Sequence, residues 1–290
     1  TEKVSLHFGI NKYQHWGDLS NAVNDANSTA KRFKNVLGFD QTTVVVDENV
    51  TADNIKQHFS NLSTVHPGAL IVITWHGHGA TLEMANGKDN GYLVPHEVTK
   101  PLALTNCGNY VSMSDVKKWT NEWLKAIHVV LLFDCCFSGM SLRGEISDGK
   151  KKNIVKHLGM KCRYIINAGT KNELVADGRG AHSPFIEAFL QSSCGSGDDV
   201  ECHVKRLQLE IEDYVAEMEN IEQTPTGGKM EGGEGGVAFL ALPSLKTSAG
   251  LTVSENGDVV VEGGMGRGGG GGGGAVQARG ETKEPSEDVA

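Results

Sequence analysis

Short apolar runs alternate along the chain with longer segments in which apolar residues recur at helical spacing. The short runs are rich in β-branched residues, which indicates strands. We predict strands over residues 4–10, 42–46, 69–75, 128–133, 162–168 and 237–242. The runs 69–75 and 128–133 are almost continuously apolar, as expected of strands that are covered on both faces.

The longer segments predict amphipathic helices. Residues 19–37 place apolar side chains at a period of about 3.6 residues, and Gly38 ends the pattern. Similar segments predict helices over residues 51–62, 112–124, 184–190 and 200–218. Strands and helices that alternate in this way predict the α/β class, with a mostly parallel sheet and helices on both faces. In such sheets the reactive groups lie beyond the carboxyl ends of the strands.

Glycine is unevenly distributed, and its positions divide the chain. Of the 37 glycines, one cluster lies within residues 227–236 and a second, nearly pure run covers residues 263–274. The segment that follows is polar and cannot bury enough apolar surface to offset the entropy of ordering. We therefore expect one folded domain over residues 1–243 and a Gly-rich, largely disordered tail over residues 244–290.

Charge and cysteine usage narrow the function classes. The net charge of −9 argues against binding to a nucleic-acid backbone, which requires clustered basic residues. No apolar run is long enough to span a membrane, and the first residues do not resemble a signal segment. The six cysteines show no CxxC spacing, so we expect free thiols in a reducing compartment and a cytoplasmic location.

Two predicted strands are followed directly by side chains that can carry chemistry. His76-Gly77-His78-Gly79 follows the strand over residues 69–75, and Asp134-Cys135-Cys136 follows the strand over residues 128–133. Histidine and cysteine at neighbouring strand ends can act as a base and a thiol nucleophile. Each residue alone is more often structural, and together they could also hold zinc. Adjacent cysteines chelate poorly and no second metal motif supports zinc, so we favour a catalytic dyad.

These segments carry a family resemblance. Residues 75–79 (WHGHG) and 134–139 (DCCFSG) resemble the catalytic segments of metacaspases, which are caspase-like cysteine peptidases of family C14 in clan CD. Further matching segments occur in the family's order: residues 8–13 (FGINKY), 19–26 (LSNAVNDA), 91–95 (GYLVP), 166–190 and 223–225 (QTP). The resemblance covers residues 3–243 and implies a caspase-like three-layer sandwich with a six-stranded, mostly parallel sheet. It also implies a large-subunit-like part over residues 1–142, a candidate processing loop over 143–161 and a small-subunit-like part over 162–243.

The resemblance assigns roles to individual residues. It makes Cys136 the nucleophile and His78 the base, and the backbone N–H groups of Gly79 and Cys136 would then form the oxyanion hole. It places Asp25, His76 and Asp134 at the primary specificity (S1) pocket, where His76 replaces the usual serine. Two neighbouring carboxylates repel one another unless a cation lies between them. We therefore expect protein or peptide substrates that are cleaved after Arg or Lys.

Activation and assembly follow from the same resemblance. Lys150-Lys151-Lys152 in the candidate processing loop would suit self-cleavage by an enzyme with basic specificity. Metacaspases are commonly activated by calcium, and Asp89 and Asp115 lie where some ligands are expected, but basic Arg143 stands where relatives have an acid. We therefore assign no metal ligands, expect no cofactor for the chemistry itself, keep calcium activation as a disfavoured alternative, and expect a monomer. Two alternatives remain open: a catalytically silent caspase-like scaffold that binds partners, and a zinc-binding α/β module.

Overall fold

The computed structural model describes residues 2–136, 159–169, 177–178, 180–195, 202–234, 238–241, 250–253 and 259–262. The chain divides into two compact units, Thr1–Ser244 and Leu245–Ala290. The first unit contains the two hydrophobic core clusters and every residue discussed below as a candidate for function.

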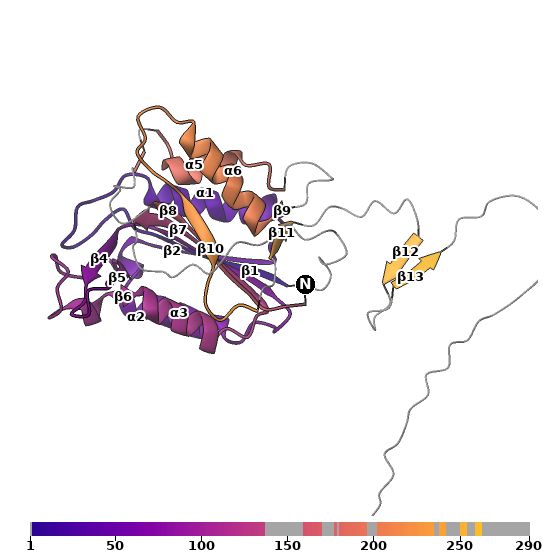
Figure 1. The fold of residues 1–290 in the computed structure, drawn as a ribbon, viewed down its shortest axis with the longest axis horizontal. Helices are drawn as coiled ribbons and strands as arrows, with labels where there is room; N and C mark the ends of the chain where they lie inside the picture. The colour runs from indigo at the N-terminus through magenta and orange to yellow at the C-terminus, as the bar shows by residue number, and fades with distance from the viewer. Residues whose placement is uncertain are drawn as a thin grey trace, which may run out of the picture. The chain divides into compact units, whose positions relative to one another are not determined.

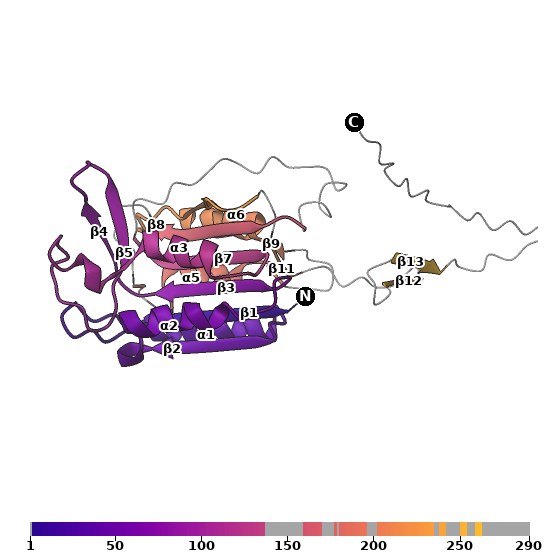
Figure 2. The ribbon, with the colours of Figure 1, turned by 90° about the horizontal axis from the view of Figure 1, so that it is seen from below.

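A central six-stranded sheet forms the middle layer of the first unit (Figures 1 and 2). Its strands are β1 (Lys3–Gly9), β2 (Gln41–Val46), β3 (Leu70–His76), β7 (His128–Cys136), β8 (Cys162–Gly169) and β10 (Thr226–Lys229). Their order across the sheet is β10-β8-β7-β3-β1-β2, and only β10 is antiparallel to its neighbour. The predicted mostly parallel sheet is therefore confirmed.

Helices cover both faces of this sheet, as Figure 1 shows. On one face lie α1 (Ala22–Asn35), α5 (Pro184–Gln191) and α6 (Val204–Ala216), and on the other lie α2 (Ala52–Leu62) and α3 (Met113–Glu122). Two short 3-10 helices, η1 (Asp47–Asn49) and η2 (Cys107–Asn109), lie in the connections. The arrangement confirms the three-layer α/β sandwich.

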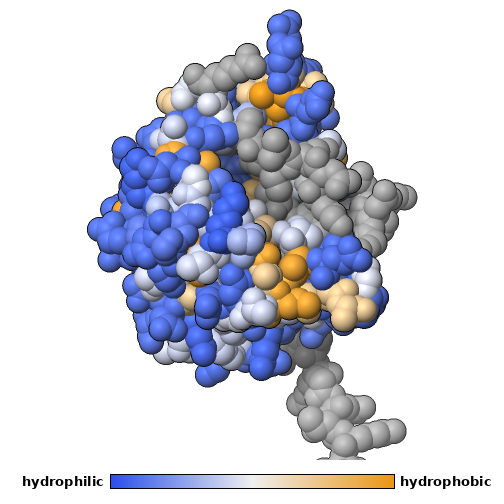
Figure 3. Space-filling view, turned by 90° about the vertical axis from the view of Figure 1, so that its left-hand side faces the viewer, coloured by the Kyte–Doolittle hydropathy of each residue, from blue (hydrophilic) through white to orange (hydrophobic). Residues whose placement is uncertain are grey.

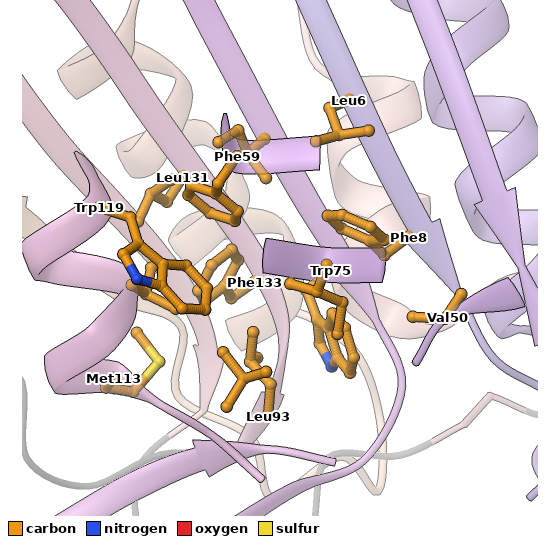
Figure 4. Packing of buried hydrophobic residues seen from close by; sticks show 14 of the residues in the cluster. Leu6, Phe8, Val50, Phe59, Trp75, Leu93, Met113, Trp119, Leu131 and Phe133 are labelled. Carbon is orange, nitrogen blue, oxygen red and sulfur yellow. The ribbon is translucent and has the colours of Figure 1, made fainter. Parts of the chain in front are cut away.

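The alternation of side chains along β1 shows how one strand serves both layers. Leu6 and Phe8 pack into the cluster beneath α2 and α3, while His7 points to the other face, its ring 5.5 Å from that of Phe33. Figure 4 shows the first cluster, in which aromatic side chains of β3, β7, α2 and α3 meet. The rings of Phe59 and Trp119 lie 5.2 Å apart there. The second cluster joins α1 to α5, with the rings of Phe33 and Phe189 stacked at 5.5 Å.

The sixth strand of the sheet is not the one that the sequence indicated. The predicted strand over residues 237–242 appears as β11 (Phe239–Ala241), which pairs with β9 (Cys202–His203) in a separate two-stranded sheet. The edge position is taken by β10, whose sequence Thr-Gly-Gly-Lys has no apolar pattern. A Cβ atom at Gly227 would lie only 2.7 Å from the Gln208 side chain, so close packing against α6 favours glycine in this strand.

Further strands were not predicted. β4 (Gly79–Glu83), β5 (Asp89–Leu93) and β6 (Val111–Ser112) form a small antiparallel sheet that begins directly beyond β3. In the second unit, β12 (Gly250–Val253) and β13 (Val259–Glu262) form an antiparallel hairpin within the segment that we expected to be largely disordered. The tail from residue 263 onward lies outside the described residues.

Cysteine pairing corrects one prediction. Cys194 and Cys202 form a disulfide with a Cα–Cα distance of 5.0 Å, so the expectation of free thiols is wrong for these two residues. The pairing joins the end of α5 to β9, a proximity that depends on the fold and leaves no mark in cysteine spacing. Cys107 and Cys162 keep free thiols, and the cytoplasmic location stays a prediction. Among the described residues, no helix combines the length and apolar character needed to cross a membrane.

Candidate active site

A pocket of about 350 Å³ opens at the carboxyl ends of β3 and β7. It is lined by Trp16, Gly17, Leu19, Ala22, Asp25, Gly77, His78, Gly79, Lys100, Asp134, Cys135, Asp177 and Ser183. The face of the molecule at these strand ends is mostly hydrophilic with separate hydrophobic patches (Figure 3). Four of the predicted site residues, Asp25, His78, Gly79 and Asp134, therefore lie around one pocket, although they come from three different parts of the chain.

The end of β7 carries the predicted nucleophile. In the pairing with β8, Phe133 lies opposite Asn167 whereas Cys136 lies opposite Gly169, so β7 holds one extra residue between these positions. Such bulges occur at sheet rims, where they redirect side chains. Cys136 is described as the last residue of this strand, and the position of its side chain lies outside the description.

His78 is held by the loop that precedes α1. Its Nε2 lies 2.7 Å from the carbonyl oxygen of Gly17. Because a carbonyl can only accept, Nε2 carries the proton and Nδ1 presents a lone pair. The Tyr13 hydroxyl accepts a hydrogen bond of 2.8 Å from the His78 backbone N–H, and the ring of Trp16 lies 5.5 Å away. This orientation leaves Nδ1 as the nitrogen that can accept a proton.

The surroundings of His78 also set its charge. Burial lowers the pKa of its imidazole below the ordinary value of 6.5, the Gly17 contact opposes this, and Lys100 lowers it further. A lowered pKa keeps the ring neutral near pH 7, as a general base requires. The glycine before it is constrained as well, because a Cβ at Gly77 would lie 2.6 Å from the Tyr13 hydroxyl.

Asp25 and Asp134 meet at His182 and Ser183, the two residues that precede α5. The carboxylate of Asp25 is 1% exposed, with Oδ1 at 2.6 Å from Nδ1 of His182 and Oδ2 accepting a hydrogen bond of 3.1 Å from the Ser183 N–H. The Ser183 hydroxyl donates to Oδ2 of Asp134 over 2.6 Å. Burial and then the nearby charge of Asp134 raise the pKa of Asp25 to about 8. The two carboxyl groups thus form a buried acidic end to the pocket.

His76 lies behind these carboxylates and is entirely buried. It faces Asp134 across the β3–β7 pair, and its Nδ1 is 3.9 Å from Oδ2 of Asp134. On its other side, Nε2 is 2.9 Å from the Thr74 hydroxyl, which is also 2.9 Å from Nδ1 of His7. Burial holds the pKa of His7 well below its usual range, with a smaller contribution from His76 in the same direction.

Several contributors were not identified from the sequence. The Gly17 carbonyl orients His78, a third group that the predicted dyad of His78 and Cys136 did not include. His182 and Ser183 hold the acidic residues, and Asp177 accepts hydrogen bonds from the backbone N–H groups of Ser20 and Asn21 at the pocket rim. A backbone carbonyl has no sequence signature, and the position of His182 depends on how the small-subunit-like part folds back onto α1.

The residues considered for calcium are placed differently. At the start of α3, the Ser112 hydroxyl donates a hydrogen bond to the Asp115 carboxylate and accepts one from the Asp115 backbone N–H. Asp89 lies on β5. Within the described part of the chain, one group of potential ligands has donor atoms within 4.8 Å of one another, and it consists of Asp25, His76 and Asp134. Arg143 and Lys150–Lys152 lie outside the described residues, so the candidate processing loop stays a prediction.

Comparison with known proteins bears on this site. The family model of the caspase domain, peptidase family C14, matches residues 2–229. The chain belongs to the caspase-domain family. This membership points to cysteine peptidase activity and to protein substrates. A search of curated proteins gave no match.

Solved structures share the fold of this caspase domain at low sequence identity. A protein of Geobacter sulfurreducens from a structural genomics programme is 14% identical with a TM-score of 0.57, over 79% of this chain and 94% of that one. The Drosophila initiator caspase Dronc is 14% identical with a TM-score of 0.53, over 80% of each chain. Caspase-1 from Spodoptera frugiperda is 13% identical with a TM-score of 0.52, over 79% and 86%.

Proposed function

We propose that this caspase domain is a metacaspase-like cysteine endopeptidase that cleaves peptide bonds after Arg or Lys. The proposal is carried by one observation: His78, with a lone pair on Nδ1, and the buried carboxyl groups of Asp25 and Asp134 line the same pocket. Cys136 belongs to the strand that ends at this pocket. The proposed enzyme acts as a monomer and needs no cofactor for the chemistry.

In the proposed reaction, Nδ1 of His78 takes the proton of the Cys136 thiol, and the thiolate attacks the substrate carbonyl carbon. The backbone N–H groups of Gly79 and Cys136 stabilise the negative oxygen. The imidazolium returns its proton to the departing amine, leaving an acyl-enzyme. His78 then activates a water molecule that releases the peptide acid and restores the thiol. Throughout the reaction, Nε2 of His78 keeps its proton and donates it in a hydrogen bond to the Gly17 carbonyl oxygen. This hydrogen bond stabilises the imidazolium.

The proposed specificity follows from charge at the closed end of the pocket. Asp25 and Asp134 lie close enough for the charge of Asp134 to raise the pKa of Asp25. A guanidinium or ammonium group placed beside both carboxyl groups would lower the pKa of Asp25, favour loss of its proton and pair with the carboxylates. An acidic substrate side chain would instead add a third carboxyl group to the same space.

Fluorogenic peptides that differ only at the P1 residue test this proposal. We expect kcat/KM for Arg and Lys peptides to exceed that for the Asp peptide by about 100-fold, because like charges brought together cost several kcal/mol. Asp134→Asn should raise KM for the Arg peptide more than it changes kcat. Asp40→Asn serves as the control, because Asp40 accepts a hydrogen bond from the backbone of Lys3 at the opposite end of the sheet.

Preferential cleavage after Asp would overturn the proposed specificity. The nucleophile is tested separately with an Arg-containing thiol-reactive peptide, which should label the wild-type chain and leave Cys136→Ala unlabelled. A chain that neither hydrolyses any peptide in the panel nor reacts with the probe would be a catalytically silent scaffold.

A further inference from the structure

The closed end of the pocket contains buried polar atoms without hydrogen-bond partners. Among the described residues this is true of Nδ1 of His76 and of Oδ1 of Asp134. His76 is 0% exposed and Asp134 is 6% exposed, so water at the surface does not satisfy these atoms. The Thr74 hydroxyl can donate to or accept from Nε2 of His76, so Nδ1 carries either a proton or a lone pair. A buried nitrogen and a buried carboxylate oxygen that lack partners are costly, and a cation between the two side chains would satisfy both atoms.

The distances suit a small cation. One ligand atom from each of Asp25, His76 and Asp134 lies within 4.8 Å of the others, and Nδ1 of His76 is 3.9 Å from Oδ2 of Asp134. Tetrahedral zinc with bonds of about 2.0–2.1 Å would place its ligand atoms about 3.3 Å apart. Small rotations of these side chains would therefore close the gap between them. The existing hydrogen bonds to the carboxylates can persist, because each carboxylate oxygen has a second lone pair.

Neighbouring groups already orient the three side chains. Nε2 of His76 contacts the Thr74 hydroxyl, and the Ser183 hydroxyl donates to Asp134. Metal-binding histidines and carboxylates are typically fixed by such outer contacts. One imidazole and two carboxylates match Zn²⁺ and related transition-metal ions, and they are too few for calcium, which takes six to eight oxygen ligands. We propose that Asp25, His76 and Asp134 bind one divalent transition-metal ion, with Zn²⁺ as the best match.

The pocket gives a metal ion a route to the proposed site, and it also makes the bound ion compete with substrate. Asp25 and Asp134 line its wall, so an ion can reach them from solvent and keep an open coordination position towards the pocket. The same carboxylates would receive the basic side chain of a substrate, so metal and substrate would exclude one another. This competition rests on the proposed peptidase specificity, whereas the binding of metal rests only on the three side chains.

Metal binding is measured on full-length Cys136→Ala, which lacks the thiol of the proposed dyad, a group that can itself bind metal. Titration with Co²⁺ should produce the visible absorption of a tetrahedral site and saturate near one ion per chain, and Zn²⁺ should displace it. His76→Gln in this background should weaken binding by at least about 10-fold. His66→Gln is the matched control, because His66 is exposed in the turn before β3, at the opposite end of the sheet.

His76→Ser, which restores the serine usual in metacaspases, is the second variant if His76→Gln does not fold, as judged by its thermal melting and circular dichroism. Failure of the Cys136→Ala chain to bind near-stoichiometric Co²⁺ would overturn the proposal. Unchanged metal affinity in both His76 variants would also overturn it. If His78→Ala loses binding while the His76 variants still bind, the ion lies at the dyad, which would overturn the proposal as well.

Competition is measured separately with the wild-type chain and an Arg peptide. Zn²⁺ should raise KM without lowering kcat, and saturating peptide should restore the rate. A chain that binds Co²⁺ through His76 but hydrolyses no peptide would contradict the proposed peptidase and leave the metal site intact. If the wild-type chain hydrolyses peptides but Cys136→Ala binds no metal, the proposed metal site is contradicted and the proposed peptidase stands.

Discussion

The protonation of His78 depends on groups that are distant from it in the sequence. The Gly17 carbonyl fixes the proton on Nε2, and burial disfavours the charged ring. Lys100 acts in the same direction as burial because its positive charge repels an imidazolium. Lys100 is exposed and lies at the pocket, with its ammonium group 4.8 Å from the ring centre of Trp16. Because Lys100 is exposed, solvent and salt screen its effect on the pKa of His78.

We predict that Lys100→Gln moves the acidic limb of the pH profile of kcat/KM to higher pH by a few tenths of a unit. Removing a positive charge raises the pKa of His78, so the base becomes protonated, and activity is lost, at a higher pH than in the wild type. The position of the limb is the readout, since the plateau also reflects substrate binding. Lys88→Gln, in the turn between β4 and β5, should leave the limb in place.

Ionic strength provides a further check on this charge effect. The difference between Lys100→Gln and the wild type should shrink in high salt, because salt screens interactions of exposed charges. A limb that moves to lower pH, or that does not move at low salt, would contradict the assignment of His78 as the titrating base.

At the scale of residues, sequence indicated the charged and reactive groups of the site but not the contacts that control them. Asp25, His76, His78 and Asp134 follow recognisable local motifs, and the register between β3 and β7 brings His76 opposite Asp134. Gly17 contributes through its backbone, which any residue type could supply. Likewise, the sequence does not show that Nδ1 of His76 and Oδ1 of Asp134 lack hydrogen-bond partners, because that depends on how the side chains pack.

Among the helices and strands, α5 contributes both to the stability of the fold and to the proposed specificity for Arg or Lys, through its N-cap residue. Ser183 is its N-cap: the hydroxyl accepts a hydrogen bond of 3.1 Å from the Ile186 N–H and donates one of 2.6 Å to Asp134. The same hydroxyl thus satisfies the first turn of a helix and one oxygen of a buried carboxylate. Thr51 caps α2 in the same manner, accepting from the Asn54 N–H over 3.2 Å, but it does not line the pocket.

We predict that Ser183→Ala and Thr51→Ala differ in their effect on catalysis. Loss of a cap costs about 1 kcal/mol in each variant. In Ser183→Ala, the buried carboxylate of Asp134 also loses a donor, which adds about 1–3 kcal/mol. Denaturant unfolding should therefore show the larger loss of stability for Ser183→Ala. Only this variant should alter KM for the Arg peptide, because only Ser183 orients Asp134.

Equal changes of KM in both variants would contradict this role for Ser183. If instead KM stays constant in both, Asp134 does not need the Ser183 hydroxyl to receive a basic side chain.

Helices were predicted more reliably than strands, and the reason is physical. The segments that became α1, α2 and α5 each bury one face, so their apolar residues recur with the helical period. β10 lies at the sheet edge and consists of Thr-Gly-Gly-Lys, whose place is set by contact with β8 and α6 rather than by its own apolar residues. The apolar segment over residues 237–242 looked like the closing strand, but β11 pairs with β9.

Across the whole molecule, the sheet and the helices join the two halves that flank the candidate processing loop. β7 and β8 pair from His128 opposite Cys162 to Cys136 opposite Gly169. In the layer formed by α1, α5 and α6, the Arg32 guanidinium donates to the carbonyl oxygens of Leu190, Ser192 and Cys194 over 2.7–2.8 Å. Asp25 contacts His182 and Ser183 in the same layer. These contacts do not require a continuous chain between β7 and β8.

We predict that the wild-type chain cuts itself after a basic residue of the 143–161 segment and remains one particle. Denaturing electrophoresis should show two pieces of similar size, while native mass spectrometry should show a single species with the mass of both, because the β7–β8 pairing and the α1–α5 contacts hold them together. Cys136→Ala should remain whole, and Lys150–Lys152 replaced by Gln should cut more slowly. Equal fragmentation of Cys136→Ala would show that another protease makes the cut, and separation of the pieces under native conditions would contradict the inference that the sheet holds them.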